Sequence, residues 1–331
     1  MFLVNHHDRL FNIPKKIYTN SPSISYNIFE NHHINNHKGP SGCLATDNSA
    51  KISFLKSYSE LLERRTLMVS YIKKDKIRVF NLVNKKIETI DSKKSRYNND
   101  VRYSSDTTGT SAGLKSQDLI IKSILELLEK NSLFLFWYCN FGNEIILTNY
   151  HTEYTNTILR AGFKIRSYSV EYFPNTITII SLIIDSKETG IVSSGINCHT
   201  HAEQALENSI QEAFLLLFQE NIVQKTVQSK SIEYNYLQSK KLKKISVDKL
   251  KKKYKIITND PDFIINFLPK WIKTIFIIKL PYKESVIMAY SNELFNSIPD
   301  KHYIYLDKEI NKRVSKITSL ELNRIPECII K

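Results

Sequence analysis

Cysteine, glycine and proline are all scarce in this chain of 331 residues, which contains 4, 8 and 9 of them. The cysteines are Cys43, Cys139, Cys198 and Cys328. They lie far apart in the sequence and include no Cys-x-x-Cys pair. This spacing argues against a structural zinc site and against a small secreted fold held by disulfides, and it fits a reducing compartment.

Long hydrophobic runs are also missing. The longest apolar stretches, such as residues 176–184, are too short to cross a bilayer, and residues 1–10 lack the apolar core of a signal peptide. Hydrophobic residues still make up 42% of the chain and aromatic residues 11%, enough for a substantial core. We therefore expect a cytoplasmic protein with no membrane partner.

Acidic residues are outnumbered, and the formal net charge is +14. Lysine is concentrated in residues 73–94 and 240–255. Neither run has the interleaved aromatic side chains of a single-strand binder, and no known nucleic-acid-binding motif is present. We interpret the excess charge as solvated surface and expect no nucleic-acid partner.

One phrase recurs on three predicted helices. It reads KSYSELLERR at residues 56–65, KSILELLEKN at 122–131 and, more loosely, NSIQEAFLLL at 208–217. In every copy a serine is followed three residues later by a glutamate, and the first two copies add a second glutamate and a cation. Residues i and i+3 share one face of a helix, so the two carboxylates of a pair converge. These carboxylates are Glu60, Glu63, Glu126, Glu129 and Glu212.

The neighbours of the glutamates decide between a solvated face and a binding site. Glu60 and Glu63 fit an exposed face with an i,i+4 ion pair. Leu119 and Leu133 share the stripe of Glu126, and isoleucine and leucine fill most of the remaining circumference of that helix. A helix that is apolar nearly all round is buried. Because a buried carboxylate needs a partner, a bound cation or a basic residue is expected beside it.

The remaining pattern predicts an α+β domain in which related helix and strand units pack around a common centre. Expected helices span residues 50–71, 116–137 and 202–219. Expected strands include a hairpin at 76–90 and single strands at 163–173, 177–185, 271–280 and 302–306. Residues 106–113 and 193–200 are expected to be small-residue loops, and the tail at 321–331 shows no regular pattern. The first loop is neither a Walker P-loop nor a Gly-x-Gly-x-x-Gly turn.

In order along the chain, these motifs resemble the YcaO family, most of all its microcin-B-type cyclodehydratase subunits. The resemblance rests on a Glu-x-x-Glu-Arg helix, an Asp-x-x-Gly loop twenty residues before a second Glu-x-x-Glu-cation helix, and a Gly-x-x-x-His segment before Ala-Leu and a helical glutamate. The residues that carry it are Glu60, Glu63, Arg64, Asp106, Gly109, Glu126, Glu129, Lys130, Gly195, His199, Ala205, Leu206 and Glu212. Lys130 stands where relatives have arginine.

The resemblance implies a single YcaO-like α+β domain over residues 1–331, with repeated helix and strand units around a central ATP and Mg²⁺ site. Its best-supported core is 41–220, followed by a lysine-rich connection at 225–255 and a C-terminal, strand-containing part at 256–331.

The resemblance also implies ATP and Mg²⁺ as cofactors, and oxygen ligands of this kind suit Mg²⁺. The expected metal ligands are Glu60, Glu63, Glu126, Glu129 and Glu212. The expected ATP contacts are Lys56, Ser57, Arg64, Asp118, Ser123 and Lys130. No catalytic base is identified. His199 is the best-placed histidine, and the alternative is that it is a structural residue of its loop.

The activity implied by the resemblance is that of an azoline-forming cyclodehydratase in the biosynthesis of a ribosomally made, post-translationally modified peptide such as a thiazole/oxazole bacteriocin. Two alternatives stay open: a YcaO-type enzyme that forms thioamides or amidines, and a non-catalytic scaffold or docking subunit. The implied partners are a precursor peptide, a protein that binds its leader, and a flavin-dependent dehydrogenase.

Overall fold

The computed structural model describes most of the chain apart from its N-terminal segment and the lysine-rich connection. The described residues are 22–28, 33–34, 37–38, 42–69, 75–95, 106–113, 115–147, 150–188, 190–223, 246–248, 260–280, 285–301 and 306–328. Within these ranges, no helix is both long enough and apolar enough to cross a membrane.

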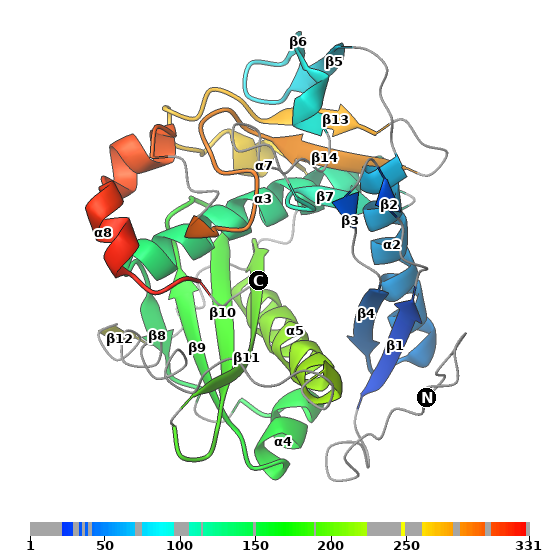
Figure 1. The fold of residues 1–331 in the computed structure, drawn as a ribbon, viewed down its shortest axis with the longest axis vertical. Helices are drawn as coiled ribbons and strands as arrows, with labels where there is room; N and C mark the ends of the chain where they lie inside the picture. Colours follow the sequence, from blue (N-terminus) through cyan, green and yellow to red (C-terminus); the bar gives the residue numbers. More distant parts are fainter. Residues whose placement is uncertain are drawn as a thin grey trace.

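Helix α3 (Ser116–Cys139) runs through the middle of the molecule, between two five-stranded sheets (Figure 1). One sheet has the strand order β6-β5-β13-β14-β7 and the other β11-β10-β9-β8-β12. The first consists of β5 (Lys76–Asn81), β6 (Lys86–Asp91), β7 (Thr110–Ala112), β13 (Phe276–Lys279) and β14 (Val286–Tyr290). The second consists of β8 (Asn143–Ile145), β9 (Lys164–Val170), β10 (Ile177–Ile184), β11 (Ile191–His199) and β12 (Ser246–Asp248). With a sheet on either side, nearly every residue of α3 from Leu119 onward is buried, as its all-round apolar pattern predicts.

Strand β10 connects the two halves of the core. All eight of its residues are buried. Because side chains alternate along a strand, Ile180 and Leu182 pack in the cluster that contains α3, whereas Ile177 and Ile179 pack against α5 (Ala202–Val223). This explains why its sequence is an unbroken apolar run rather than an alternating one. The fold is thus layered as sheet, α3, sheet and α5.

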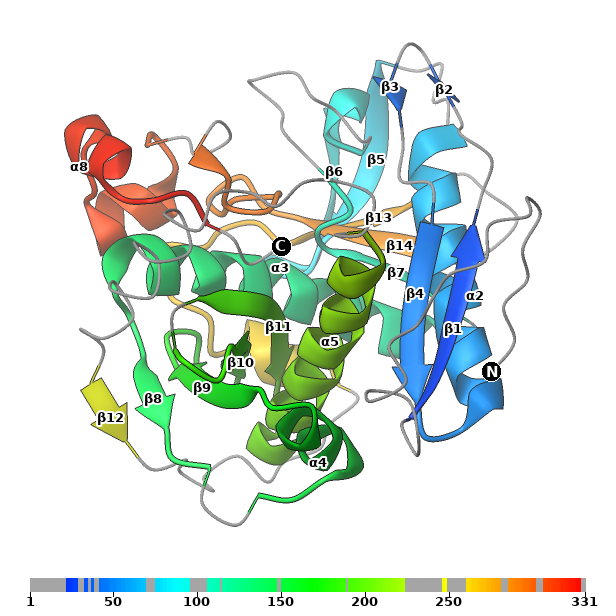
Figure 2. The same cartoon turned by 60° about the horizontal axis from the view of Figure 1, so that its bottom comes forward.

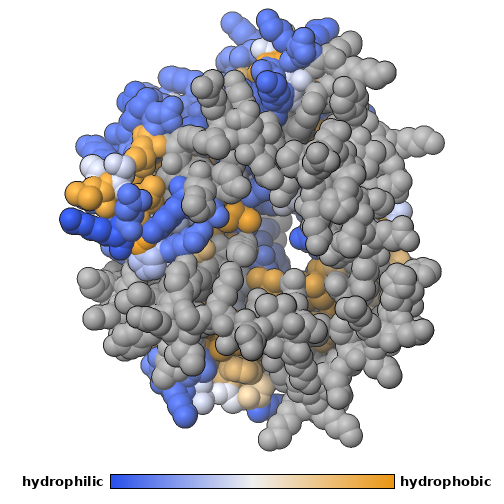
Figure 3. Space-filling model, in the orientation of Figure 1, coloured by the Kyte–Doolittle hydropathy of each residue, from blue (hydrophilic) through white to orange (hydrophobic). Residues whose placement is uncertain are grey.

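Helix α2 (Ala50–Val69) packs on the hairpin of β1 (Ser23–Ile28) and β4 (Gly42–Asp47), opposite α5 (Figures 1 and 2). The Ser53 hydroxyl on α2 reaches the carbonyl oxygen of Ala45 on β4 at 2.9 Å. In the space-filling view the face between α2 and α5 is hollowed (Figure 3). The arrangement leaves α2, α3 and α5 facing a common interior region.

Smaller elements complete the described chain: β2 (His33–Ile34), β3 (His37–Lys38), α4 (Glu153–Arg160), α7 (Asp262–Ile265), α8 (Ser319–Arg324) and the short turns η1 (Ser92–Ser95) and η3 (Asn311–Ser315). The expected helices at 50–71, 116–137 and 202–219 are confirmed with small shifts of their ends, and so are the hairpin and the strands expected at 163–173 and 177–185. The strand expected at 271–280 begins only at Phe276. The strand expected at 302–306 falls mostly outside the described residues.

Three expectations are wrong in whole or in part. Residues 106–113 were expected to form a loop, but their last part forms β7, which pairs with β14. Residues 193–200 were expected to form a loop because they are small and polar, but they form most of β11, an edge strand that α5 covers. Gly195 explains the composition: a Cβ atom there would lie 2.1 Å from the Ser209 carbonyl oxygen and 2.3 Å from the Ala213 nitrogen. The tail was expected to lack regular structure, but it contains α8, which Thr318 and Glu321 start with a reciprocal capping box.

Candidate functional site

Carboxylates from all three phrase helices form one electrostatically coupled cluster. Glu60 and Glu63 come from α2, Glu126 and Glu129 from α3, and Glu212 from α5. The charge of Glu60 raises the pKa of Glu63, that of Glu63 raises the pKa of Glu126, and that of Glu129 raises the pKa of Glu212. The five predicted metal ligands are therefore neighbours in space, although they span more than 150 positions of sequence. We call them the carboxylate cluster.

On α2, the two glutamates differ in their partners. Glu63 accepts a hydrogen bond from the backbone N–H of Ala112 on β7 at 2.7 Å, and burial raises its pKa to about 8. Glu60 is half-buried and pairs with Arg64 at 2.5 Å, one turn later on the same helix. It also accepts a hydrogen bond from the backbone of Leu44. The surface interpretation of this helix thus fails for Glu63.

Strand β11 supplies backbone donors to the other two helices. The N–H of Ile196 donates to Glu212 at 2.7 Å, and the N–H of Cys198 donates to Glu129 at 3.1 Å. Burial raises the pKa of Glu212 to about 7, although the positive charge of Lys130 opposes the shift. The segment that the sequence marked only as small and polar is therefore what orients two of the carboxylates.

Glu126 has no such support. No described residue donates a hydrogen bond to it. Burial raises its pKa well above the usual value, and the charges of Glu63, Glu129 and Asp106 raise it further, while Lys130 opposes them. Lys130 is ion-paired with Glu129, so an ionised Glu126 has no ion pair or hydrogen-bond donor of its own among the described residues, and it is the residue of the cluster that most requires an external cation.

Two basic residues of the phrase lie within the cluster. The Lys130 ammonium group is buried and lies 2.8 Å from Glu129, and the carboxylates of Glu129, Glu212 and Glu126 raise its pKa. Arg64 pairs with Glu60 and also hydrogen-bonds the thiol of Cys43. The two cations thus have different roles: Lys130 sits among three carboxylates in the interior, whereas Arg64 lies at a half-buried edge.

The serines of the phrase are structural within their own helices. All three are fully buried, and each hydroxyl donates to the carbonyl three residues earlier. These bonds run from Ser57 to Phe54 at 3.0 Å, from Ser123 to Ile120 at 2.8 Å and from Ser209 to Leu206 at 2.9 Å. Ser57 and Ser123 were expected to contact ATP, and in this structure their hydroxyl protons are engaged in these bonds.

The expected ATP contacts Lys56 and Asp118 are both accessible. Lys56 forms an exposed ion pair with Asp47 at 2.7 Å, one turn before Glu60 on α2. Asp118 lies in the first turn of α3 and is half-buried. Each lies on a helix of the cluster, Lys56 one turn before Glu60 and Asp118 two turns before Glu126.

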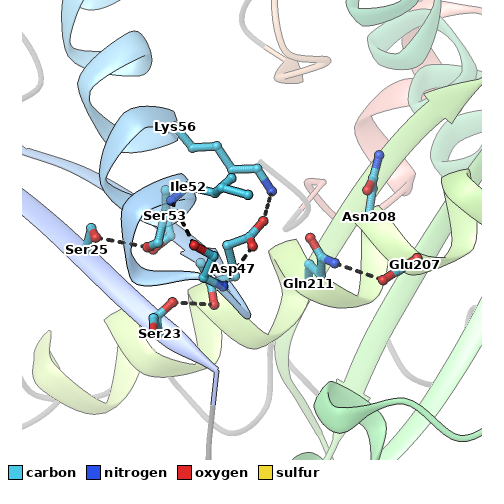
Figure 4. Close-up of polar contacts among 12 residues, drawn as sticks. Ser23, Ser25, Asp47, Ile52, Ser53, Lys56, Glu207, Asn208 and Gln211 are labelled. Carbon is cyan, nitrogen blue, oxygen red and sulfur yellow. Dashed lines mark hydrogen bonds and ion pairs between the residues drawn. The ribbon is translucent and has the colours of Figure 1, made fainter. Parts of the chain in front are cut away.

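Across from the Lys56–Asp47 pair, α5 presents polar side chains (Figure 4). Gln211 donates to Glu207 at 3.3 Å, and Asn208 lies one turn before Glu212 on the same helix. Helices α2 and α5 thus both carry polar side chains one turn before their glutamates of the cluster. These side chains provide hydrogen-bonding groups beside it.

His199 ends β11, and its surroundings favour the structural interpretation. Its Nδ1 accepts a hydrogen bond from the backbone N–H of His201 at 2.9 Å. Burial, followed by the nearby His201, lowers its pKa. The ring is therefore neutral near pH 7, and one of its nitrogens is occupied in holding the turn into α5.

Gly109 and Asp106 of the predicted Asp-x-x-Gly loop hold this loop beside the cluster. Gly109 has φ +76°, and a Cβ atom there would lie 2.5 Å from the Ala289 carbonyl oxygen on β14. Asp106 accepts from the N–H of Thr108 at 2.7 Å and from that of Ile298 at 2.8 Å. The loop thereby places β7 against the cluster, where the Ala112 N–H of this strand donates to Glu63.

The donor set of the cluster fits Mg²⁺, which prefers carboxylate oxygens together with phosphate oxygens. Among the described residues, no group of three or more His, Cys, Asp or Glu side chains is close enough to hold a metal ion by protein ligands alone. The carboxylate cluster is an interior site in which acidic side chains outnumber the basic ones, Arg64 and Lys130.

Sequence and structure comparisons agree with this geometry. The family model described as YcaO cyclodehydratase, ATP- and Mg²⁺-binding, matches residues 91–246. This range contains α3 and α5 but not α2, which the fold adds to the cluster. No curated protein sequence matches the chain.

Three solved structures share the fold. A chain of the E. coli microcin synthetase McbBCD complex is 15% identical, with 98% of both chains covered and a TM-score of 0.72. The YcaO protein of Methanopyrus kandleri bound with AMPPCP and Mg²⁺ is 12% identical, with 77% of this chain and 79% of that chain covered and a TM-score of 0.61. A heterocyclase in complex with substrate and cofactor is 10% identical, with 86% and 49% covered and a TM-score of 0.65.

Proposed function

We propose that the chain is an ATP- and Mg²⁺-dependent cyclodehydratase subunit of the YcaO type that forms azolines in a ribosomally made peptide, and the match of the YcaO family model to residues 91–246 supports this. The observation that carries the proposal is Glu126. It is a carboxylate without a hydrogen-bond donor among the described residues, and the charges of Glu63 on α2 and of Glu129 on its own helix act on it. An external cation is the partner that such a group requires.

In this proposal the carboxylate cluster holds Mg²⁺ together with the phosphate oxygens of ATP. When bound, Mg²⁺ supplies charge stabilisation for phosphoryl transfer. Glu63, Glu129 and Glu212 are held in place by backbone N–H groups of β7 and β11, so they are pre-oriented. Glu126, which no such donor restrains, is left to complete the ion's coordination.

The reaction that we propose has three bond changes. The thiol or hydroxyl of a Cys, Ser or Thr side chain gives up its proton and adds to the preceding amide carbonyl carbon of the peptide, which leaves negative charge on the carbonyl oxygen. The carbonyl oxygen then takes the γ-phosphoryl group of ATP, and ADP leaves. Loss of phosphate and of the amide proton forms the C=N bond of the azoline. Arg64 and Lys130 are ion-paired with Glu60 and Glu129, and we propose that they stabilise the charge that develops on the phosphates.

The partners follow from the same proposal. The E. coli relative is part of a complex, and one structure of that complex has pro-MccB17 bound. We propose that this chain likewise acts on a precursor peptide, together with a protein that binds the leader and with a flavin-dependent dehydrogenase. The polar groups of Asp47, Lys56, Asn208 and Gln211 beside the cluster offer contacts for ATP or for the peptide backbone.

The test is turnover by the reconstituted complex. We expect Glu126→Gln combined with Glu129→Gln to abolish peptide-dependent ATP hydrolysis, and Glu203→Gln on the exposed face of α5 to leave it unchanged. Unchanged hydrolysis in the double variant would refute the proposal. Peptide mass separates the chemistries: each azoline loses one water, whereas a thioamide exchanges oxygen for sulfur. An unchanged peptide mass, together with no ATP binding in the wild type, would favour a scaffold.

A further inference from the structure

Two lysines that lie far apart in the sequence converge on Asn292, in the loop that follows β14. The ammonium group of Lys94, which belongs to η1, donates to the Oδ1 atom of Asn292 at 2.8 Å. The ammonium group of Lys308, which precedes η3, donates to the backbone carbonyl oxygen of the same residue at 2.9 Å. Both lysine side chains are half-buried. Two positive charges are therefore held on one residue, and neither belongs to the carboxylate cluster.

The fold positions this pair. The backbone N–H of Asn292 donates to the Oγ1 atom of Thr274 at 2.9 Å, which fixes the residue that both lysines contact. The Lys94 nitrogen lies 5.3 Å from the centroid of the buried Tyr290 ring, and this cation–π contact orients the side chain. The two ammonium groups thus meet on a defined scaffold rather than on a freely moving surface loop.

No carboxylate of the described residues balances the two charges. The charge of Glu293 acts on both lysines, but this carboxylate already accepts from the N–H and the hydroxyl of Thr274 at 3.0 and 2.7 Å and from the Ser291 hydroxyl at 3.1 Å. Neither Lys94 nor Lys308 forms an ion pair with a described residue. Each ammonium group has three N–H donors, of which one has a described partner. Because two neighbouring cations repel each other, the arrangement lacks an anion.

From this geometry we propose that Lys94 and Lys308 form an oxyanion site whose ligand carries two negative charges, as phosphate and sulfate do. A dianion between the two ammonium groups balances both charges, and its oxygens accept the N–H donors that remain. Free inorganic phosphate and the phosphate group of a larger molecule share this chemistry. The site uses no residue of the proposed function, so each can fail without the other.

The repulsion within the pair makes the site sensitive to pH. Burial, followed by the charge of Lys94, lowers the pKa of Lys308 to about 8, while Asp307 and Glu293 oppose the shift. A bound dianion favours the protonated ammonium group. Sulfate keeps two charges at neutral and alkaline pH, so a change in its affinity reports the lysines. Its affinity should be about tenfold lower at pH 9 than at pH 7, because Lys308 must then take up a proton on binding.

The first experiment needs no variant. The full chain is acetylated at pH 7 with a neutral N-hydroxysuccinimide ester, and mass spectrometry of its peptides gives the rate at each lysine. Millimolar phosphate or sulfate, compared with chloride at equal ionic strength, should slow acetylation of Lys94 and Lys308 at least about fivefold, because the bound dianion keeps them protonated. Exposed Lys316 should react equally fast in all three salts.

Phenyl phosphate distinguishes the two sources of the ligand. Protection of both lysines equal to that by inorganic phosphate means that the site accepts the phosphate group of a larger molecule. Protection by inorganic phosphate and sulfate alone assigns the site to the free ion.

The second experiment measures sulfate affinity by calorimetry. Lys94→Met and Lys308→Met should each weaken binding at least about tenfold, because each removes a charge-assisted hydrogen bond. The matched control is Lys316→Met, which removes the same charge from an exposed position and should bind like wild type. Sulfate should also raise the melting temperature of wild type and of the control but not that of Lys308→Met. A purely structural role of the lysines predicts no such difference.

Three outcomes would overturn the proposal. One is acetylation of Lys94 and Lys308 at equal rates in sulfate and chloride, which decides the matter even where a variant does not fold. Another is sulfate binding by both variants as tight as that of wild type. The third is an affinity for sulfate that stays constant between pH 7 and pH 9. The proposed function fails separately, through unchanged ATP hydrolysis in the Glu126→Gln and Glu129→Gln variant.

Discussion

At the scale of single residues, five glutamates of one repeated phrase have three different environments. Glu63, Glu129 and Glu212 each accept a backbone N–H from a neighbouring strand. Glu60 shares its charge with Arg64 at a half-buried edge. Glu126 has neither kind of partner among the described residues. Residue type and helical spacing are the same in the first two copies, so the difference arises from what lies beside each helix.

Because of this difference, Glu126→Gln and Glu129→Gln should change the free energy of unfolding of the metal-free protein in opposite directions. Glu126→Gln should raise the free energy of unfolding by about 1 kcal/mol, because it removes a charge that burial and three nearby carboxylates disfavour. Glu129→Gln should lower it by about 3 kcal/mol, because it takes the nearest counter-ion from buried Lys130. Urea unfolding in a chelator measures both, and a similar loss in the two variants would contradict the assignment.

At the scale of elements, the approach of α5 to β11 determines the shape of the site. The helix lies so close that Gly195 leaves no room for a side chain, since both nearest atoms are backbone. The hydroxyls of Ser167, Ser181 and Ser209 continue the same contact, each 2.8 Å from the next. Small residues at this interface bring Glu212 within reach of the Ile196 N–H.

Gly195→Ala should therefore destabilise the protein by about 3 kcal/mol or more, as overpacking against backbone atoms does. The matched control is Gly162→Ala, where no atom lies within 4 Å of the added Cβ and only the positive φ of 88° opposes the substitution. The control should cost about 1 kcal/mol. Thermal or urea unfolding measures the difference, and equal losses would mean that the close contact between α5 and β11 is not essential.

At the scale of the whole molecule, the buried carboxylates link folding to pH and to ligand. Burial raises the pKa of Glu63 to about 8 and that of Glu212 to about 7, from ordinary values near 4.5. When a folded-state pKa is raised, the folded state binds more protons than the unfolded chain between the two values, so stability falls as the pH rises through this window. The metal-free fold should thus be less stable at pH 8 than at pH 5.

We expect that loss to be on the order of 5 kcal/mol between pH 5 and pH 8 in a chelator. Glu63→Gln combined with Glu212→Gln should flatten the profile, because an amide does not titrate. Mg²⁺ with a non-hydrolysable ATP analogue at about a hundred times its Kd should add about 2.7 kcal/mol. At one fixed ligand concentration the gain should be larger at pH 8 than at pH 5, since binding at pH 8 displaces fewer protons and the Kd is lower. Denaturation series at both pH values measure this, and a profile that rises with pH would contradict it.

The sequence by itself determined the local features. Apolar periodicity located α2, α3 and α5 to within a few residues, and the unbroken apolar run of β10 indicated a strand buried on both faces. The repeated glutamates and their order along the chain carried the resemblance to the YcaO family, because helical spacing places residues i and i+3 on a shared face. These features depend on residues close together in the chain, whose relative positions regular backbone geometry sets.

Only the tertiary structure decided which glutamate does what. The donors to Glu63 and Glu129 are backbone groups of Ala112 and Cys198, 49 and 69 positions away, and a backbone N–H leaves no mark in a sequence. Lys130 is another example. In the sequence it only takes the place that Arg64 has in the first copy of the phrase. The packing of α3 between two sheets makes it a buried cation among carboxylates. Burial and long-range contacts set charge energetics, and both are properties of the folded chain rather than of its local pattern.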